Sequence, residues 1–304
     1  AENFMREGDC MKKRMLRVKR NLHMLMLLPA CALFFVFFLF PILQGILLSF
    51  TNWDGFGRMD FVGLENFFDF FKDDRALNAM KNTLIFGVFG AVSLNLFGLI
   101  YALILDEGLK GSGLVRTLVY LPNIISPLIM GYIWVLILSS EGGVLKTTLE
   151  GLGLPQLYSD WLADPKAAIV VILIINLWQA IGGDMMIYIS GLQTISDSVH
   201  EAALIDGASY LKELIFIKIP LLGPSLRVNI ITNIIGCMSI FDIIMSLTGG
   251  GPGFFTESLS VFIYRQSSAG NAGYSSAVAV LLFLTILVPV TISFMATKKM
   301  EDNA

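Results

Sequence analysis

Residues 275–296 have the sequence SSAVAVLLFLTILVPVTISFMA, a run of 22 residues without one charged side chain. Because an α-helix needs about 20 mostly apolar residues to cross roughly 30 Å of hydrocarbon, this run predicts a membrane-spanning helix. The same criterion predicts six spans in the whole chain, at residues 27–49, 82–105, 115–138, 167–192, 226–248 and 275–296. The expected fold class is therefore an all-α integral membrane protein with six transmembrane helices, multi-pass in the cell membrane.

The overall composition agrees with this class. Hydrophobic residues make up 55% of the 304 residues, charged residues only 15%, and the mean hydropathy is +0.73. An average soluble domain has about 25% charged residues, and a soluble fold with so much apolar surface would leave large patches exposed. The first apolar run is longer than the roughly 7–15 residues of a signal-peptide core, so we expect it to remain as the first span.

Several predicted spans contain residues that a plain lipid-facing helix avoids. Proline inside a membrane helix is tolerated where neighbouring helices or polar side chains satisfy the freed carbonyl groups. We therefore predict that all six spans are helices of one bundle. The residues in question are Asn95 in the second span, Pro122 and Pro127 in the third, and Asn176, Gln179 and Asp184 in the fourth.

The positive charges indicate the orientation. Of the 21 Lys and Arg residues, 14 fall in the N-terminal segment and the connections on its side, and seven fall on the other side. Cytoplasmic connections carry an excess of Lys and Arg, so we expect both termini in the cytoplasm. The predicted organisation is a basic cytoplasmic segment at 1–26, a first helix with its outer loop at 27–81, a core domain at 82–296 and a cytoplasmic tail at 297–304.

The basic segment is interpreted as a topology anchor that can contact anionic membrane lipid. It is one short cluster without interleaved aromatic residues, so no nucleic-acid partner is expected. The cysteines Cys10, Cys31 and Cys237 and the histidines His23 and His200 show no disulfide framework and no metal-ligand spacing. We interpret the cysteines as small apolar fillers and expect no metal site.

The longest predicted inner connection, at about residues 193–225, has helical signals of its own. Ser198 and Glu201 have the spacing of a capping box, and the residues 202–205 that follow favour a short helix. Gly207 can end or bend that helix, because glycine accepts backbone angles that other residues do not.

Residues 210–217 predict a second short helix, whose extension Pro220 and Pro224 limit. The two helices together are called the knob below. On the pattern alone, packing of the knob against its own bundle remains as good an interpretation as contact with another chain.

The knob carries a family resemblance. Glu201-Ala202-Ala203, then Gly207, then Ile217-Lys218-Ile219-Pro220, resembles the cytoplasmic loop signature of ABC importer permeases, although the family often has Leu where Ile219 stands. Asp206-Gly207-Ala208 resembles the form in the carbohydrate branch, which includes maltose-like, lactose and glycerol-phosphate permeases. Similar segments elsewhere extend the resemblance over residues 30 to 296; they are Phe61-Val62-Gly63-Leu64-Glu65-Asn66-Phe67, Arg116 with Tyr120-Leu121-Pro122 and Trp134, Gly191-Leu192-Gln193, and Leu247-Thr248-Gly249-Gly250-Gly251-Pro252-Gly253 with Thr256 and Tyr264-Arg265.

The resemblance implies a type I ABC importer permease fold and a division of labour between chains. The permease would pair with a second homologous permease, and the knobs would insert into a cytoplasmic ATPase dimer that holds ATP and Mg. An extracytoplasmic solute-binding protein would deliver a sugar, or another solute such as glycerol phosphate. Carried over by position, the ATPase-coupling contact consists of Glu201, Ala202, Ala203, Asp206 and Gly207.

Candidate substrate contacts are polar side chains at membrane depth. A central Asp costs roughly 2.5–3.5 kcal/mol on insertion scales, so such groups tend to face a cavity or a partner. Amides and carboxylates can bind sugar hydroxyl groups, and an aromatic face can stack on the ring. For each candidate, hydrogen bonding between helices remains the alternative. The candidates are Asn176, Trp178 and Gln179 in the fourth span and Asn229, Asn233, Ser239 and Asp242 in the fifth, with Ser239 and Asp242 favoured by the resemblance.

The chain itself is not expected to be an enzyme or to hold a cofactor. A phosphate-binding loop needs the form G-x-x-x-x-G-K-[ST]. The nearest segment, 142–147, has Leu and not Gly directly before its Lys, and it falls on the predicted outer face. Two other classes stay open. A secondary transporter would have an inverted repeat, which is not visible in the sequence. An intramembrane enzyme is disfavoured because the chain has only two histidines, no nucleophile motif and no paired carboxylates at membrane depth.

Overall fold

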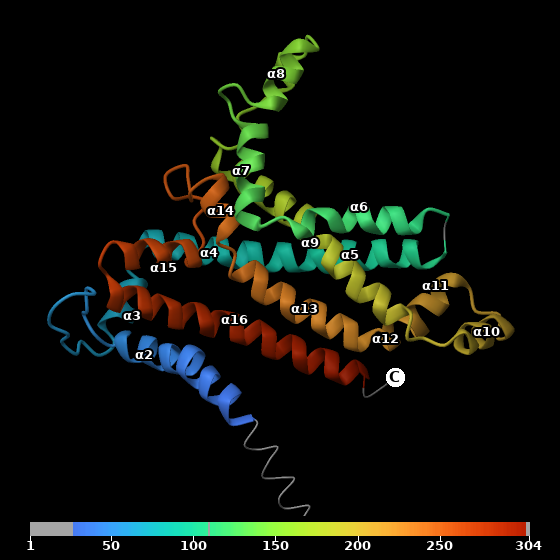
Figure 1. Ribbon diagram of the computed structural model, residues 1–304, viewed down its shortest axis with the longest axis horizontal. Helices are drawn as coiled ribbons and strands as arrows, with labels where there is room; N and C mark the ends of the chain where they lie inside the picture. The colour runs from blue at the N-terminus through green and yellow to red at the C-terminus, as the bar shows by residue number, and fades with distance from the viewer. Residues whose placement is uncertain (1–26, 109, 302–304) are drawn as a thin grey trace, which may run out of the picture.

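The computed structural model describes residues 27–108 and 110–301 (Figure 1). These residues form helices and an isolated antiparallel bridge between Thr51 and Phe61, so the predicted all-α class is confirmed. The predicted anchor at 1–26, with Cys10 and His23, and the last residues of the predicted tail lie outside the described residues.

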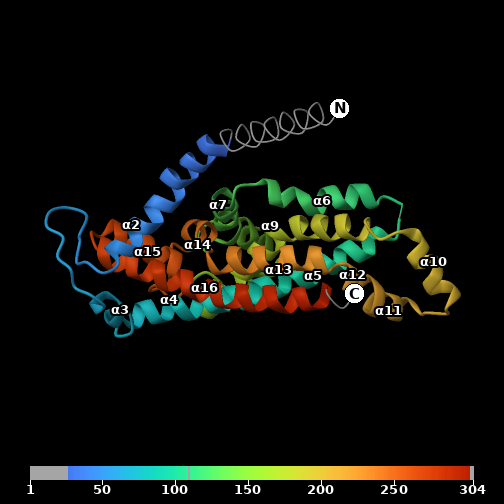
Figure 2. The same cartoon turned by 90° about the horizontal axis from the view of Figure 1, so that it is seen from below.

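Within the described residues, five helices are long and apolar enough to cross a membrane: Leu27–Leu48, Asp74–Asp106, Pro165–Leu192, Gly223–Leu247 and Ala272–Lys298. The second begins eight residues before the predicted start. Figures 1 and 2 show four of them side by side along the longest axis, while Leu27–Leu48 leaves the bundle at an angle. The elements that compose them are η1 (Phe35–Leu39), α2 (Phe40–Leu48), α4 (Asp74–Ile85), η2 (Phe86–Gly90), α5 (Ala91–Asp106), α9 (Pro165–Leu192), α13 (Gly223–Met238), α14 (Asp242–Leu247) and α16 (Ala272–Glu301).

The third predicted span is present as a helix broken in two. It consists of α6 (Ser112–Ile124) and α7 (Pro127–Leu138), which meet at 96°. Ile125 and Ser126 between them have ψ angles of 134° and 135°. Because the residue before a proline is pushed towards extended backbone, Pro127 fixes this bend, and α7 projects from the side of the bundle (Figure 1).

The fifth span is also interrupted, which the sequence did not indicate. Helix α13 ends before Ser239, and Phe241, with φ −133° and ψ −59°, separates it from α14. No proline or glycine lies between residues 237 and 242, so the break has no local signal. A distant residue satisfies it, because the Ser258 hydroxyl donates to the Ile240 carbonyl at 2.7 Å.

Short helices cap the two ends of the bundle. At the end opposite the knob these are α3 (Glu65–Phe70) and α15 (Leu259–Ser268), whereas α8 (Val144–Gly151) and η3 (Pro155–Leu157) follow α7 on the projection from the side of the bundle (Figure 1). At the other end the chain forms α10 (Asp197–Ile205), α11 (Tyr210–Glu213), η4 (Leu214–Lys218) and α12 (Ile219–Leu221). The C-terminal end of α16 lies close to α12 (Figures 1 and 2), on the side that the charge distribution assigns to the cytoplasm.

Helix α9 is the centre of the packing and contacts α5, α6 and α13. Two glycines permit the closest approaches. A Cβ atom added at Gly182 would lie 2.5 Å from the Val119 carbonyl oxygen of α6, and one added at Gly98 would lie 2.8 Å from the Asp184 Cβ atom of α9. Small residues let membrane helices pack backbone to backbone, and here they fix the positions of α5 and α6 against α9.

The end of the bundle opposite the knob is closed by a buried ionic cluster. Glu257, fully buried, accepts hydrogen bonds from Arg75 Nε and Nη2 at 2.8 and 2.9 Å. Arg265 Nε lies 3.3 Å from the same carboxylate, and Asn82 Nδ2 donates to the Glu257 carbonyl oxygen at 2.9 Å. A buried charge needs such pairing, so these groups bind α4 and α15 firmly to the loop between α14 and α15.

Gly182→Ala tests the packing of α6 on α9. The added methyl group meets backbone atoms of Val119 and Tyr120, which cannot rotate away, so we expect a loss of about 1–3 kcal/mol in stability, as for other overpacked sites. The measurement is the thermal transition of the detergent-solubilised protein. Gly236→Ala is the control, because nothing lies within 4 Å of a Cβ atom there; equal melting of both variants would contradict the packing described.

Candidate functional site

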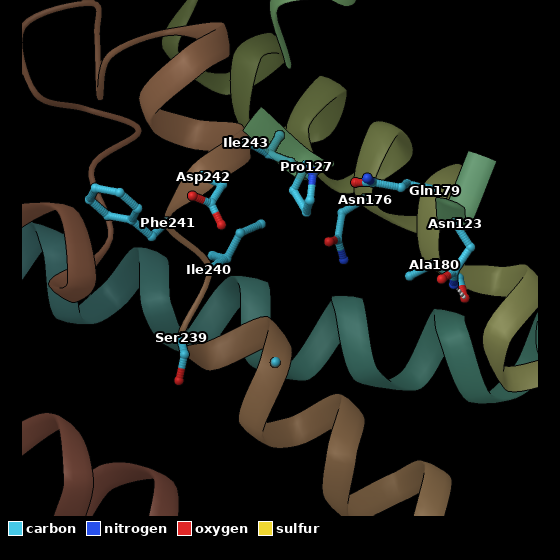
Figure 3. A pocket seen from close by; sticks show the side chains of 11 residues that line it. Asn123, Pro127, Asn176, Gln179, Ala180, Ser239, Ile240, Phe241, Asp242 and Ile243 are labelled. Carbon is cyan, nitrogen blue, oxygen red and sulfur yellow. Dashed lines mark hydrogen bonds between the residues drawn. The ribbon is translucent and has the colours of Figure 1, made fainter. Parts of the chain in front are cut away.

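The two interrupted spans enclose a pocket of about 250 Å³. Its wall comes from the break between α6 and α7, the middle of α9, and the break between α13 and α14 (Figure 3). Interrupted backbone at membrane depth is tolerated only where it is buried in protein or lines a cavity, so the location of the pocket follows from the breaks. It is lined by Asn123, Pro127, Asn176, Gln179, Ala180, Gly236, Ser239, Ile240, Phe241, Asp242 and Ile243.

A side chain of α9 satisfies a backbone group that the first break frees, and a side chain of α6 binds α6 to α9 nearby. Gln179 Nε2 donates to the Ile125 carbonyl oxygen at 2.8 Å, and Asn123 Nδ2 donates to the Ala180 carbonyl oxygen at 3.3 Å. Gln179 is buried. Its primary interaction is therefore structural, as the alternative of hydrogen bonding between helices anticipated, although it also borders the pocket.

Four of the seven candidate substrate residues line the pocket, and they differ in orientation. Figure 3 shows the side chains of Asp242 and Asn176 directed into the same space from opposite walls. Gln179 extends along the wall towards Pro127, and the Ser239 hydroxyl points away from the other lining side chains. The structure therefore brings together Asp242, Asn176 and Gln179, and places Ser239 at the pocket through its backbone.

The other three candidates lie outside the pocket. Asn233 Nδ2 donates to Asp184 Oδ2 at 2.9 Å, and Asn229 Nδ2 donates to the Asp184 carbonyl oxygen at 3.2 Å. Both asparagines are buried and hold α13 on α9. Trp178 packs edge to face on Trp134 with ring centroids 5.7 Å apart.

The knob is built differently from the predicted capping box. Helix α10 begins two residues earlier, with Ser196 at its N-cap and no side-chain cap, and the Ser196 and Ser198 hydroxyls lie 2.8 Å apart. Glu201 therefore lies inside the helix and caps nothing, and the predicted capping box is wrong. Because Ser196 already has extended backbone, with φ −73° and ψ 144°, the helix starts there.

The end of α10 agrees with the prediction for Gly207. Its φ is +72°, a left-handed conformation that favours glycine. The Gly207 and Ala208 amides donate to the Leu204 and Ala203 carbonyl oxygens at 3.1 and 3.0 Å, which is the Schellman arrangement. Helix α11 then continues through η4 and α12 past Pro220 and ends at Leu221, so the limit falls between the two predicted prolines, Pro220 and Pro224.

The knob extends beyond the end of the bundle (Figures 1 and 2), which disfavours the interpretation that it packs against its own helices. Four of the five predicted coupling residues are exposed, namely Glu201, Ala202, Asp206 and Gly207, while Ala203 is buried. Large apolar side chains are exposed beside them, including Ile205 at 86%. An exposed apolar patch rimmed by polar residues marks an interaction site.

An ion pair holds the two halves of the knob together. The buried Glu213 carboxylate lies 2.8 Å from His200 Nδ1 of α10 and 3.3 Å from Lys218 Nζ of η4. The hydrogen bond from His200, aided by Lys218, lowers the pKa of the Glu213 carboxyl below its usual value. The ionised Glu213 carboxylate therefore stabilises the knob fully above the pKa of a free glutamate, and this stabilisation is lost as the pH falls through the lowered pKa.

Sequence reasoning missed several residues of these sites. Asn123, Gly236 and Phe241 line the pocket, and Glu213 organises the knob. Asn123 had a usable signal, because it follows Pro122 inside an apolar span. Glu213 had none, because its partners become neighbours only after the knob folds.

A bundle of membrane-spanning helices with a pocket between two interrupted spans, and an exposed knob at one end, defines a membrane transport permease. The chain matches the family described as "Binding-protein-dependent transport system inner membrane component" over residues 94–299. It belongs to this family, whose members are permease subunits of ABC importers and not enzymes.

The relatives agree with this assignment. The probable ABC transporter permease protein YurN of Bacillus subtilis is 33% identical, with 91% of this chain and 97% of the relative covered. The trehalose/maltose transport system permease protein MalF of Thermococcus litoralis is 34% identical over 86% of this chain and 89% of the relative. A bacterial alginate ABC transporter crystal structure matches with a TM-score of 0.80 at 23% identity, covering 94% and 97% of the two chains, and so supports the fold.

Gln179→Met tests whether the amide satisfies the break between α6 and α7. The substitution keeps a side chain of similar length but leaves the Ile125 carbonyl oxygen without its donor, so we expect a destabilisation of about 1–3 kcal/mol. Thermal denaturation in detergent measures it. Gln193→Met, at the exposed end of the same helix, is the control; a Gln179→Met protein as stable as this control would show that the break is held by other groups.

Proposed function

We propose that this chain is the permease subunit of an ATP-driven sugar importer. Its relatives include permeases named for trehalose and maltose, for lactose and for sn-glycerol 3-phosphate. Amide and carboxylate groups in the pocket fit a solute rich in hydroxyl groups. A sugar is therefore the proposed solute class, with glycerol phosphate as the alternative from the same set of relatives.

The observation that carries the proposal is the position of the pocket and the knob on the same rigid elements. Helix α9 is continuous for 28 residues; it borders the pocket at Asn176 and Gln179 and leads directly into the knob after Leu192. Helix α13 enters from the knob at Gly223 and reaches the pocket at Gly236. A displacement of the knob is thus carried to two walls of the pocket.

The contacts between these helices make that transmission rigid. Leu222, fully buried at the junction of the knob with α13, packs in one cluster with Met185 and Leu192 of α9. Farther along, Asn229 and Asn233 bind Asp184. Close-packed interiors transmit strain with little compression, so the knob, α9 and α13 move as one body.

The proposed partners follow from this arrangement. A cytoplasmic ATPase dimer with ATP and Mg engages the exposed face of α10, where Glu201 supplies a charge and Gly207 leaves open space for close approach. A second homologous permease completes the pathway beside the pocket. An extracytoplasmic solute-binding protein delivers the sugar at the opposite end of the bundle.

The test is solute-stimulated ATPase activity of the reconstituted complex with Glu201→Ala and Gly207→Ser. We expect stimulation to fall at least about tenfold, because a lost charged contact is worth about 1.5–3 kcal/mol and serine is strained at a φ of +72°. Assembly, followed by co-purification, should be preserved.

Glu141→Ala and Gly142→Ser are the matched controls. Glu141 is exposed, and Gly142 has a φ of +71° with nothing within 4 Å of an added Cβ atom, but both lie in the loop after α7. In complexes that carry either control, solute should stimulate the ATPase activity as much as it does with the unchanged chain. Transport by the chain alone, insensitive to Glu201→Ala and Gly207→Ser, would favour a secondary transporter instead.

A further inference from the structure

Asp242 is the one charged residue among the described residues that line the pocket. The remaining lining residues are amides, a serine, a glycine and apolar residues, with no Lys, Arg or His among them. Its side chain is exposed and directed into the pocket (Figure 3). Asp242 is therefore the one formally charged side chain that the described residues bring to the wall of the pocket.

The carboxylate of Asp184, also at membrane depth, has a different environment from that of Asp242. Asp184 is buried, 6% exposed, and accepts a hydrogen bond from Asn233 at 2.9 Å. The Asp242 carboxylate has no hydrogen bond or ion pair with any described side chain, and only its backbone carbonyl oxygen accepts, from Ser246. Because a charge at membrane depth persists where it faces a cavity or a partner, the Asp242 carboxylate is available to a ligand.

The amides in the wall reinforce this acceptor character. Each of three lining amides uses an N–H group on a protein acceptor, and none of their carbonyl oxygens accepts a hydrogen bond from the described residues. The wall therefore offers three free amide oxygens together with the second N–H of each amide, which suits hydroxyl groups because a hydroxyl both donates and accepts. The three contacts are Asn123 Nδ2 to the Ala180 carbonyl oxygen, Asn176 Nδ2 to Cys237 Sγ and Gln179 Nε2 to the Ile125 carbonyl oxygen.

Resting on the proposed function, we propose that Asp242 is a specificity-determining residue that makes this half of the pathway select uncharged polyhydroxyl solutes. Hydroxyl groups donate to its carboxylate and to the amide oxygens. An anionic sugar, such as a uronate or a sugar phosphate, meets a like charge without a compensating cation from this chain. Anions are therefore excluded, and an ammonium-bearing sugar is tolerated.

The test uses a reporter cysteine in the pocket, Gly236→Cys, in the assembled permease–ATPase complex with the native cysteines replaced. Nothing lies within 4 Å of a Cβ atom at Gly236, so the reporter fits. Methanethiosulfonate reagents of similar size, one cationic and one anionic, are compared, each normalised to a free thiol. We expect the cationic reagent to react about tenfold faster or more, the size expected for one nearby charge at an effective dielectric between protein and water.

Asp242→Asn should bring this ratio close to one while leaving the reporter reactive. Asp60→Asn, which removes an exposed carboxylate from the loop after the first span, is the control and should leave the ratio unchanged. Equal rates for the two reagents in the parent, or a ratio unaffected by Asp242→Asn, would overturn the proposal.

A second readout uses sugars of different charge to protect the reporter from an uncharged thiol reagent. Glucuronate and glucose 6-phosphate should protect no better than glucose, and better protection by either anion overturns the proposal. Failure of the proposed function has a separate signature. A complex without any ATP-dependent solute uptake would refute the importer, while the reagent ratio would still report on the charge in the pocket.

Discussion

The structure depends on one constraint: inside a bilayer, every backbone N–H and C=O group has to find its partner within the protein. Where α6 gives way to α7, the amide of Gln179 replaces a lost helical hydrogen bond at Ile125. Where α13 gives way to α14, the hydroxyl of Ser258 does the same at Ile240. The helices that begin at the two breaks, α7 and α14, pack on each other, and the pocket lies between the breaks and the middle of α9 (Figure 3).

Charged groups divide into those that hold the fold and those that are left for partners. Glu257 with Arg75 and Arg265, and Glu213 with His200 and Lys218, each form a paired cluster at one end of the bundle. Neither cluster leaves its carboxylate open to solvent, since Glu257 and Glu213 are both buried. Glu201 and Asp206 on the knob and Asp242 in the pocket are exposed, and these are the positions proposed above for contact with the ATPase and with the solute.

The apolar surface has a comparable division. In the first span, Leu27–Leu48, no residue of the most apolar stretch is buried within this chain. In the last span, Ala272–Lys298, 6% of the most apolar stretch is buried. Such surfaces suit lipid or a second permease, which explains the high hydropathy. On the knob, by contrast, exposed side chains such as Ile205 lie beyond the end of the bundle, where a cytoplasmic protein is the natural partner.

Hydropathy predicted where the spans lie, because burial in lipid depends mainly on the local composition of each run. Five predicted spans correspond to single candidate helices or nearly so. The remaining one, the third, has in Pro127 a local reason to bend, although not for an angle of 96°. Gly207 was predictable because its role depends on its own backbone. The capping box failed because Ser196 competes with Ser198 for the start of α10.

What could not be predicted depends on contacts between distant parts of the chain. The carbonyl freed at Ile240 finds its donor in Ser258, and the pairing of Arg75 with Glu257 joins positions 182 residues apart. In the sequence, the resemblance favoured Ser239 and Asp242 among the seven intramembrane candidates, but nothing separated the asparagines from one another. Only the fold separates Asn229 and Asn233, which bind Asp184, from Asn176 and Asp242, which face the pocket.

The most direct test of the central claim, that this pocket is the pathway of an ATP-driven importer, is its accessibility from outside. In the reconstituted complex, Gly236→Cys is labelled with a membrane-impermeant thiol reagent, without nucleotide and with ATP bound to a hydrolysis-deficient ATPase. Labelling from outside should require bound ATP, whereas a lipid-facing control, Phe283→Cys on α16, 62% exposed, should be indifferent to it. Labelling of Gly236→Cys that is the same in both states would contradict the account.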